Sequence, residues 1–267
     1  MKVKKLGTTG FLKGKVCLIA GGAGFLGKNF SKAMAAAGAT VIIADIDSIS
    51  GEKIAEAIRR ATKNNSVVFH RCDINQKQEV NKLVEAVVKK FGRIDALINN
   101  ADPMNKNRGR KFEDVTYEDF CENINLHIGG YFLMAKEVAK QMKMQGKGNI
   151  INIGSIYGCF APKFEIYKNT DMTMPIEYAA AKGAIINLTK YLASYLGKYN
   201  IRVNCLSPGG VFNNQPESFV KKYSAEVILG RRMAEPEDLS GVLLFLLSNE
   251  SGYMTGQNIV VDGGWSL

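Results

Sequence analysis

Short apolar runs alternate with longer helix-like stretches along almost the whole chain. Mostly apolar runs that are separated by helical segments are typical of strands buried in a parallel sheet. The expected strands are residues 16–20, 40–44, 66–71, 96–99, 149–153, 201–206 and 258–261. The expected helices are residues 25–37, 51–63, 76–91, 118–144, 176–199 and 236–248. This alternation predicts an α/β fold, in which a mostly parallel, doubly wound, seven-stranded sheet carries helices on both faces.

The chain shows no internal repeat, low-complexity tract or linker, so we expect one domain over residues 1–267. One irregular segment, residues 160–175, interrupts the alternation and is rich in charged, aromatic and methionine residues. It follows the fifth expected strand, at the edge of the sheet where α/β proteins bind ligands. The segment is either an ordinary surface loop or an inserted substrate-binding loop or lid.

Composition narrows the class of protein. Hydrophobic residues make up 46% of the chain and charged residues 22%, which is ordinary for a soluble globular protein. The longest apolar run, residues 242–247, is far too short to span a bilayer, so we expect no membrane partner. A basic N-terminal stretch before residues 16–20 superficially resembles a secretory signal, but the glycines that follow favour a first strand. Five scattered cysteines, an odd number, favour reduced thiols and a cytoplasmic location.

Charge and histidine content exclude several kinds of site. The two histidines, His70 and His127, lack metal-ligand spacing, so we expect neither a metal site nor a Ser-His-Asp triad. The formal net charge of +10 is spread along the chain, and basic residues cluster only in short pairs. We therefore expect no nucleic-acid partner. Attraction of phosphate-bearing cofactors or small-molecule substrates is the simpler use of this charge.

A glycine-rich turn, residues 21–27, follows the first expected strand and opens the first expected helix. Glycines there permit a tight turn and a close approach of the backbone to a pyrophosphate, whose charge the helix N-terminus favours. Asp45, at the end of the second strand, can accept both hydrogen bonds of the adenosine ribose and repels a 2′-phosphate. The pattern predicts a Rossmann-type dinucleotide site that prefers NAD(H) to NADP(H).

Tyr178 and Lys182 are four residues apart in the long expected helix 176–199. Residues at this spacing lie side by side on one face of a helix. Because an adjacent ammonium favours the phenolate, we expect Lys182 to lower the pKa of Tyr178 toward the range useful in acid–base catalysis. The same spacing is common on ordinary helix surfaces, so the pair depends on the other motifs for its meaning.

Several motifs occur together in a fixed order, and their combination resembles the short-chain dehydrogenase/reductase family, of the Tyr-x-x-x-Lys type, over essentially the whole chain. The residues that carry this resemblance are the glycine turn at 21–27, Asp45, Asp73, Asn99-Asn100-Ala101, Asn125, Ser155, Tyr178 with Lys182, Asn204, Pro208-Gly209 and residues 256–264. The resemblance implies an NAD(H)-dependent enzyme that assembles as a homo-oligomer, a dimer or tetramer.

The resemblance also implies roles for single residues. Tyr178 resembles the general acid/base, Lys182 the residue that lowers its pKa and binds the nicotinamide ribose, and Ser155 the hydroxyl that orients the reacting oxygen. Asn125 resembles the asparagine that supports a proton-relay water. The implied cofactor contacts begin with the glycine turn near the pyrophosphate, which includes Gly21, Gly24, Phe25, Leu26 and Gly27. They continue with Asp45 at the adenosine ribose, Asp73 at the adenine, and Ile74, Asn99, Ala101, Tyr178 and Lys182. The last are Pro208, Gly209 and Val211 near the nicotinamide.

The chain departs from the family pattern in several places. Ala20 replaces the usual threonine before the glycine turn, and the third glycine falls at Gly24 with Phe25 after it. Asp102 stands where a glycine commonly follows Asn-Asn-Ala. Asn213 occupies the position of a threonine that usually contacts the carboxamide. The interval from Ser155 to Tyr178 is longer than the common one, and residues 160–175 supply the extra length. A loop of this kind resembles that of members associated with surface-glycan and flagellin modification.

Together these features predict an oxidoreductase that uses NAD(H) to interconvert a secondary alcohol and a ketone. The polar segment 160–175 and the basic charge favour a carbohydrate-like substrate, such as a phosphorylated or nucleotide-linked sugar. A 3-oxoacyl thioester and a gluconate-type sugar acid stay open as other substrates, although thioester reduction would favour NADPH, which Asp45 opposes. A non-catalytic dinucleotide-binding sensor is an alternative of another class, which the intact set Asn125, Ser155, Tyr178 and Lys182 disfavours.

Overall fold

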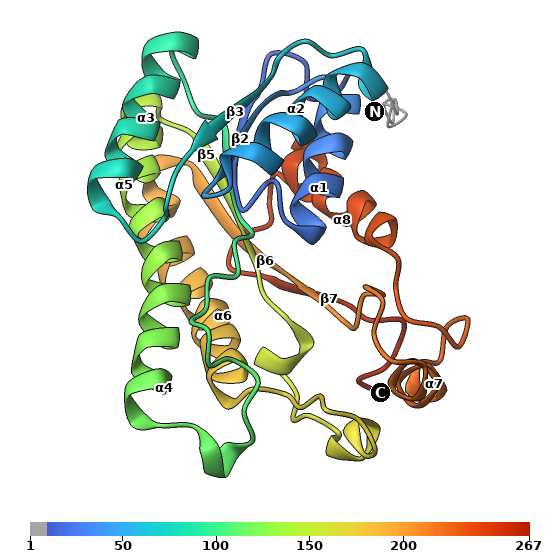
Figure 1. Cartoon of the computed structure of the whole chain (residues 1–267). Helices are drawn as coiled ribbons and strands as arrows, with labels where there is room; N and C mark the ends of the chain where they lie inside the picture. The colour runs from blue at the N-terminus through green and yellow to red at the C-terminus, as the bar shows by residue number, and fades with distance from the viewer. Residues whose placement is uncertain (1–9) are drawn as a thin grey trace.

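The computed structural model describes residues 10–267, and its centre is one parallel sheet of seven strands (Figure 1). The strands are β1 (Val16–Ala20), β2 (Thr40–Asp45), β3 (Val67–Arg71), β4 (Ala96–Asn99), β5 (Gly148–Ile153), β6 (Ile201–Pro208) and β7 (Asn258–Val261). Their order across the sheet is β3-β2-β1-β4-β5-β6-β7, and every neighbouring pair is parallel. The predicted fold class is confirmed. The first part of the basic N-terminal stretch, residues 1–9, lies outside the described residues.

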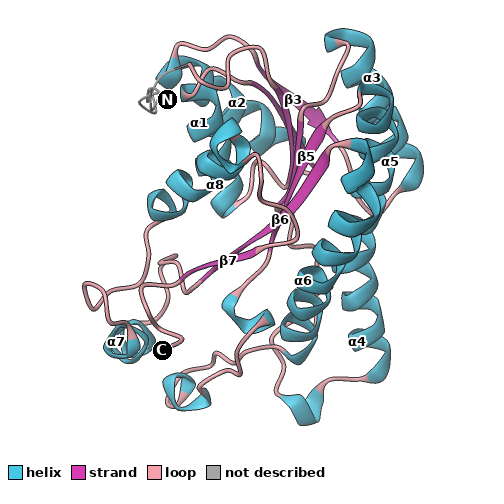
Figure 2. Cartoon of the chain, turned by 180° about the vertical axis from the view of Figure 1, so that it is seen from behind, coloured by secondary structure: helices cyan, strands magenta, loops and turns pink. Residues whose placement is uncertain are grey.

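Helices cover both faces of the sheet (Figures 1 and 2). On one face lie α1 (Phe25–Ala36), α2 (Ser48–Thr62) and α8 (Ser240–Leu247). On the other lie α3 (Lys77–Phe91), α5 (Gly130–Gln145) and α6 (Ile176–Leu196), with α4 (Tyr117–Ile124) beside α6. Each face has its own apolar core, because successive strand residues point to opposite sides: Leu18 joins one core, and Cys17 and Ile19 join the other. No helix within residues 10–267 is long and apolar enough to cross a membrane.

The helices differ from the sequence prediction in two places. The stretch predicted as one helix over residues 118–144 consists of α4, a π-helical segment (Asn125–Gly129) and α5. A π-helical turn holds an extra residue, so it changes which side chains face the core. The apolar pattern does not predict α7 (Glu217–Glu226), because only Phe219 and Tyr223 of its 10 residues are buried.

The strand order determines where a ligand can bind. β1 lies between β2 and β4, so the chain turns to one side of β1 first and to the other side later. In open α/β sheets, ligands bind at such a point, outside the carboxyl ends of the strands. The register places Ala20, Asn99 and Asn152 side by side at these ends.

Residues 160–175 are packed against α7 and the C-terminal residues. A short 3₁₀ helix, Phe164–Tyr167, buries Ile166 and Tyr167. The Tyr167 hydroxyl lies 3.0 Å from the Tyr157 hydroxyl, in the turn after β5. We define the aromatic cluster as Tyr157, Tyr167, Phe219, Tyr223 and Trp265, whose rings contact one another in series. The cluster joins the inserted segment to α7 and the C-terminus.

Candidate active site

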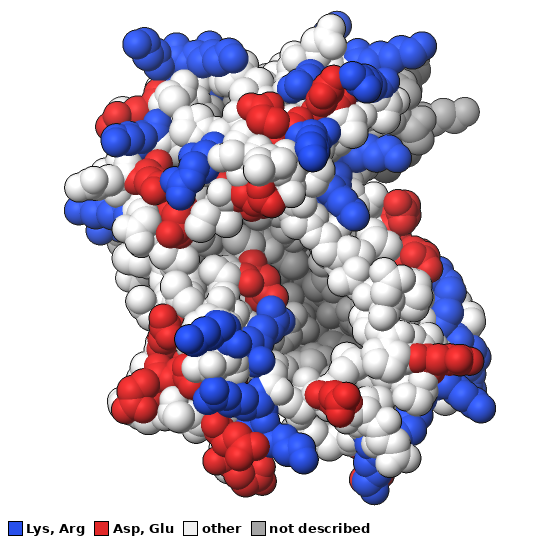
Figure 3. Space-filling model, viewed as in Figure 1, with Lys and Arg blue, Asp and Glu red and all other residues white. Residues whose placement is uncertain are grey.

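A cavity of about 590 Å³ opens at the carboxyl ends of the central strands. Figure 3 shows it as a deep hollow, and both basic and acidic side chains lie on the surrounding surface. The glycine turn and the start of α1 form one wall, and the segment after β4 and the start of α6 form another. Residues 208–215 and Met174 enclose the remaining side. The volume of this cavity and its place at the carboxyl ends of the strands are typical of a site that binds a cofactor and a small substrate.

Most of the residues predicted from the sequence line this cavity. They are Gly21, Gly24, Phe25, Leu26, Asp45, Asp73, Ile74, Ala101, Ser155, Tyr178, Lys182, Pro208, Gly209 and Val211. Gly27 and Asn99 support it from behind: a Cβ on Gly27 would lie 1.9 Å from the Gly21 carbonyl oxygen, and the Asn99 side chain donates to Asn152 Oδ1 at 2.9 Å. Asn125 does not line the cavity, and its side chain is exposed.

The glycine turn presents backbone to the cavity. Gly21 has φ +70°, and a Cβ there would lie 2.5 Å from Ala101 Cα, so only glycine fits between β1 and β4. α1 begins at Phe25 without a capping side chain or an acidic residue in its first turn. The first N–H groups of this helix are therefore available to an anion.

Asp45 is held beside the glycine turn. Its Oδ2 accepts a hydrogen bond from the Ala23 backbone N–H at 3.0 Å. The carboxylate lies at the end of β2, on the wall of the cavity. Its negative charge thus stands at one end of the site, next to the α1 N-terminus.

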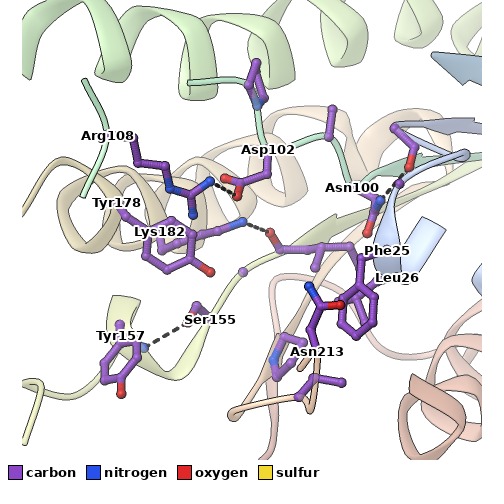
Figure 4. A pocket seen from close by; sticks show the side chains of 18 of the residues that line it. Phe25, Leu26, Asn100, Asp102, Arg108, Ser155, Tyr157, Tyr178, Lys182 and Asn213 are labelled. Carbon is purple, nitrogen blue, oxygen red and sulfur yellow. Dashed lines mark hydrogen bonds and ion pairs between the residues drawn. The ribbon is translucent and has the colours of Figure 1, made fainter. Parts of the chain in front are cut away.

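Ser155, Tyr178 and Lys182 meet at the other end (Figure 4). Ser155 follows β5, and its Oγ accepts from the Tyr157 N–H at 3.2 Å and interacts with the Tyr178 hydroxyl. Lys182 is only 3% exposed, and its Nζ donates to the Ile153 carbonyl at 2.9 Å and lies 5.4 Å from the centre of the Tyr178 ring. The three predicted side chains therefore come together at one point.

The pKa of Tyr178 differs from the sequence prediction. Burial of the phenol raises its pKa, and the nearby Asp102 carboxylate adds to the rise, whereas Ser155 and Arg108 oppose it. Burial also lowers the pKa of the Lys182 ammonium. The predicted lowering of the phenol pKa by Lys182 is thus outweighed, because removing the hydroxyl from water disfavours the phenolate.

Three side chains near Tyr178 were not predicted as site residues. Asp102 Oδ2 binds Arg108 Nη1 at 2.7 Å, and Asp102 Oδ1 lies 3.4 Å from His127 Nδ1. The Arg108 guanidinium carbon lies 5.4 Å from the centre of the Tyr178 ring. The departure of Asp102 from the family glycine was the one signal for this group. Within residues 10–267, no three or more His, Cys, Asp or Glu side chains are grouped to hold a metal ion.

The sequence and the fold are similar to those of known dehydrogenases and reductases. A family model described as enoyl-(acyl carrier protein) reductase covers residues 22–266. The chain belongs to the short-chain dehydrogenase/reductase family. A solved short-chain dehydrogenase from Leptospira borgpetersenii, with bound NAD⁺, is 35% identical with a TM-score of 0.86, over 100% of this chain and 98% of that one.

Two relatives of this short-chain dehydrogenase/reductase carry different names. The post-translational flagellin modification protein A of Campylobacter coli is 38% identical over 96% of this chain and 100% of its own length. The 3-oxoacyl-[acyl-carrier-protein] reductase FabG of Thermotoga maritima is 36% identical over 95% of this chain and 98% of its own. The predictions of the family and of an oxidoreductase are confirmed, whereas the relatives differ in what their names say of substrate.

Proposed function

We propose that this enzyme uses NAD(H) to interconvert a secondary alcohol and a ketone on a carbohydrate-like substrate, such as a phosphorylated or nucleotide-linked sugar. The observation that carries the proposal is the meeting of Ser155, Tyr178 and Lys182 in the cavity whose other end holds the glycine turn and Asp45. A dinucleotide that extended between these ends would place its ring beside the Tyr178 hydroxyl.

The cavity fits NAD(H) at its phosphate and ribose ends. The glycines at 21 and 27 leave no room for a Cβ, and the uncapped start of α1 offers N–H groups to a pyrophosphate. The Asp45 carboxylate would accept from the adenosine ribose and repel a 2′-phosphate. Asp73 and Ile74 would flank the adenine, and Pro208 to Val211 the nicotinamide.

The cofactor supplies or accepts the hydride, and the side chains handle the proton. In ketone reduction the Tyr178 hydroxyl donates a proton to the substrate oxygen, and Ser155 holds that oxygen in place. In alcohol oxidation the Tyr178 phenolate accepts the proton. Because burial raises the pKa of Tyr178, the residue is protonated at neutral pH, which favours its role in reduction. Oxidation should speed up as the pH rises.

The substrate class is supported by the polar side of the cavity and by one relative. Arg108, Asn213 and Gln215 line the cavity and can hydrogen-bond hydroxyl or anionic groups. The similarity to a flagellin modification protein favours a sugar over a fatty acyl group. Similarity to FabG and to the enoyl reductase model makes an acyl thioester the second candidate.

A substrate panel with NADH, NADPH and the oxidised cofactors tests the proposal. We expect turnover of sugar or nucleotide-sugar substrates, including sugar acids, above that of acetoacetyl thioesters. Tyr178→Phe should abolish hydride transfer and leave NADH affinity within a few-fold, because the ring stays and only the proton donor is lost. Retained turnover in Tyr178→Phe would contradict the assigned role. NADH binding without turnover on any substrate would support the sensor alternative instead.

We further propose that the enzyme works in the cytoplasm as a homo-oligomer. All five cysteines are free thiols, which suits a reducing compartment. The exposed aromatic side chains of α5 and α6 support self-association.

A further inference from the structure

The polar residue that faces Tyr178 from the middle of the long helical stretch is His127. Asn125, the residue with the predicted relay role, is exposed and outside the cavity. Both belong to the π-helical segment, whose extra residue changes the side chain that points inward. His127 is fully buried, and its ring centre lies 6.2 Å from that of Tyr178.

His127 has an unusual environment for a buried imidazole. Neither ring nitrogen makes a hydrogen bond to any of the described residues 10–267, and the nearest charged oxygen is Asp102 Oδ1, 3.4 Å from Nδ1. Burial lowers the pKa of His127 to about 3, so the ring is neutral at physiological pH. A neutral ring has one donor and one acceptor nitrogen, and burying both without partners costs free energy. A buried polar side chain that carries such a cost is often part of a functional site.

Asp102 lies beside two cations, Arg108 and Lys182 (Figure 4), and one of its oxygens lies 3.4 Å from His127 Nδ1. Its other oxygen binds Arg108 at 2.7 Å, and the buried Lys182 ammonium lies close enough to act on it. Partial loss of hydration raises the pKa of Asp102, whose side chain is still 36% exposed, but the Lys182 and Arg108 charges lower it further, so the carboxylate is ionised. A buried ammonium is costly without a negative partner. The negative charge of Asp102 is therefore suited to compensate the positive charge of the buried Lys182 ammonium.

We propose that the Asp102–His127 pair is a polar support of the catalytic tyrosine and lysine. Asp102 holds Arg108 against the Tyr178 ring and provides the negative charge that faces Lys182. His127 lies 3.4 Å from the other oxygen of Asp102, and its ring packs beside that of Tyr178. The pair are positioning residues, which act through Tyr178 and Lys182. This inference rests on the proposed role of Tyr178 in proton transfer.

The proposal predicts the direction in which each variant moves the activity. The titratable or charged groups around Tyr178 are Asp102 and Arg108 after β4, His127 in the π-helical segment, Tyr131 on α5, Tyr157 and Tyr167 after β5, and Glu177 and Lys182 on α6. Of these, Asp102 is the carboxylate that acts on the phenol, since Glu177 is turned toward Asn123 on α4. Removing the Asp102 charge should favour the phenolate, and removing the Arg108 charge should disfavour it.

The experiment measures alcohol oxidation at saturating NAD⁺ from neutral to strongly alkaline pH. We expect Asp102→Asn to move the rising limb of the kcat profile down by about one pH unit, and Arg108→Gln to move it up. Asp114→Asn is the matched control, because it removes an exposed carboxylate from the same connecting segment and should leave the limb in place. His127→Leu should lower kcat more than Asn125→Ala, and His127→Gln should restore part of the loss.

A second measurement needs no substrate. The near-ultraviolet absorbance of each protein minus that of its Tyr178→Phe counterpart follows the ionisation of Tyr178, and Asp102→Asn should lower its midpoint. An unmoved midpoint and limb in Asp102→Asn would overturn the proposal, as would a larger loss in Asn125→Ala than in His127→Leu. Either result with an inactive Tyr178→Phe contradicts only this inference. An active Tyr178→Phe contradicts the proposed function itself.

Discussion

Asp45 is fixed by its hydrogen bond from Ala23, so its charge cannot turn away from a ligand at the start of α1. We expect the wild-type protein to bind NADH at least about tenfold more tightly than NADPH, equivalent to about 1.4 kcal/mol. Asp45→Asn keeps the acceptor oxygen but removes the repulsion of a 2′-phosphate, so the preference should shrink toward one. Titration of the intrinsic NADH and NADPH fluorescence measures both affinities.

Asp47→Asn is the control for that titration. Asp47 is two residues away, exposed, and caps α2 by accepting from the Ile49 and Ser50 N–H groups. Its substitution changes net charge equally and weakens a helix cap, yet it should leave the cofactor preference unchanged. An equal loss of preference in both variants would mean that general charge, and not the Asp45 carboxylate, sets the selectivity.

His127 should make the protein sensitive to acid. Its pKa is near 6.5 when unfolded and about 3 when folded. Between these values the unfolded chain binds the extra proton, so the contribution of His127 to the free energy of unfolding is complete above pH 6.5 and disappears as the pH falls toward 3. The loss is of the order of several kcal/mol. In His127→Gln, Tm should fall less steeply over this range than in the wild type, and parallel curves would contradict the prediction.

At the residue scale, contacts could be predicted between residues that lie close together in the sequence, but not between residues that only the fold brings together. Tyr178 and Lys182 lie on one helix, so their spacing alone predicts contact. Asp102 and His127 meet only because the segment after β4 passes beside the π-helical segment, and no spacing in the sequence indicates this. The prediction that the pKa of Tyr178 is lowered was wrong for the same reason. It considered only Lys182 on the same helix, whereas the burial that raises the pKa depends on the whole fold.

Among the elements, the inserted segment 160–175 is expected to control substrate access through its contact with the turn after β5. Burial raises the pKa of both Tyr157 and Tyr167, so both hydroxyls stay protonated and the bond between them persists at neutral and moderately alkaline pH. Tyr167→Phe removes a bond worth about 0.5–1.5 kcal/mol. Because Tyr157 lines the cavity, we expect KM for the alcohol substrate to rise several-fold.

Two measurements separate this effect from a general loss of stability. NADH affinity should stay unchanged in Tyr167→Phe, because the hydroxyl pair lies away from the glycine turn. Tyr253→Phe, which removes a fully exposed hydroxyl, should change neither KM nor NADH affinity. An unchanged KM in Tyr167→Phe would show that the segment acts without this bond.

Elements were predictable where their apolar pattern is strong. All seven strands are short, mostly apolar runs, and all but β3 and β7 are largely buried. Their predicted limits differ from the observed ones by few residues. α7 escaped prediction because its apolar side chains are few and find their partners in the distant Trp265 and Tyr167. The π-helical segment also escaped, because helical periodicity does not distinguish a turn with an extra residue.

For the whole molecule, α5 and α6 present aromatic side chains to solvent that the fold itself does not cover. Phe132 is 50% exposed, Tyr191 65% and Tyr195 51%, and the two tyrosine rings stack on each other. Aromatic side chains of this kind often carry much of the binding energy of an interface. We expect the wild-type protein to sediment as a dimer or tetramer, and Tyr191→Glu with Tyr195→Glu to raise the dissociation constant at least about tenfold.

Ile49→Glu provides the comparison, because Ile49 is 71% exposed on α2, which covers the opposite face of the sheet. Sedimentation equilibrium of all three proteins over a range of concentrations gives the constants. Dissociation of the Ile49 variant to the same extent would locate the interface elsewhere, and a monomeric wild type would refute assembly altogether. Asp102, Ser155 and Arg108, which shift the pKa of Tyr178, belong to the same chain as Tyr178. We therefore expect the tyrosine variant to keep its pH profile and NADH affinity when it dissociates, and a changed profile would show that assembly contributes to the charge balance at Tyr178.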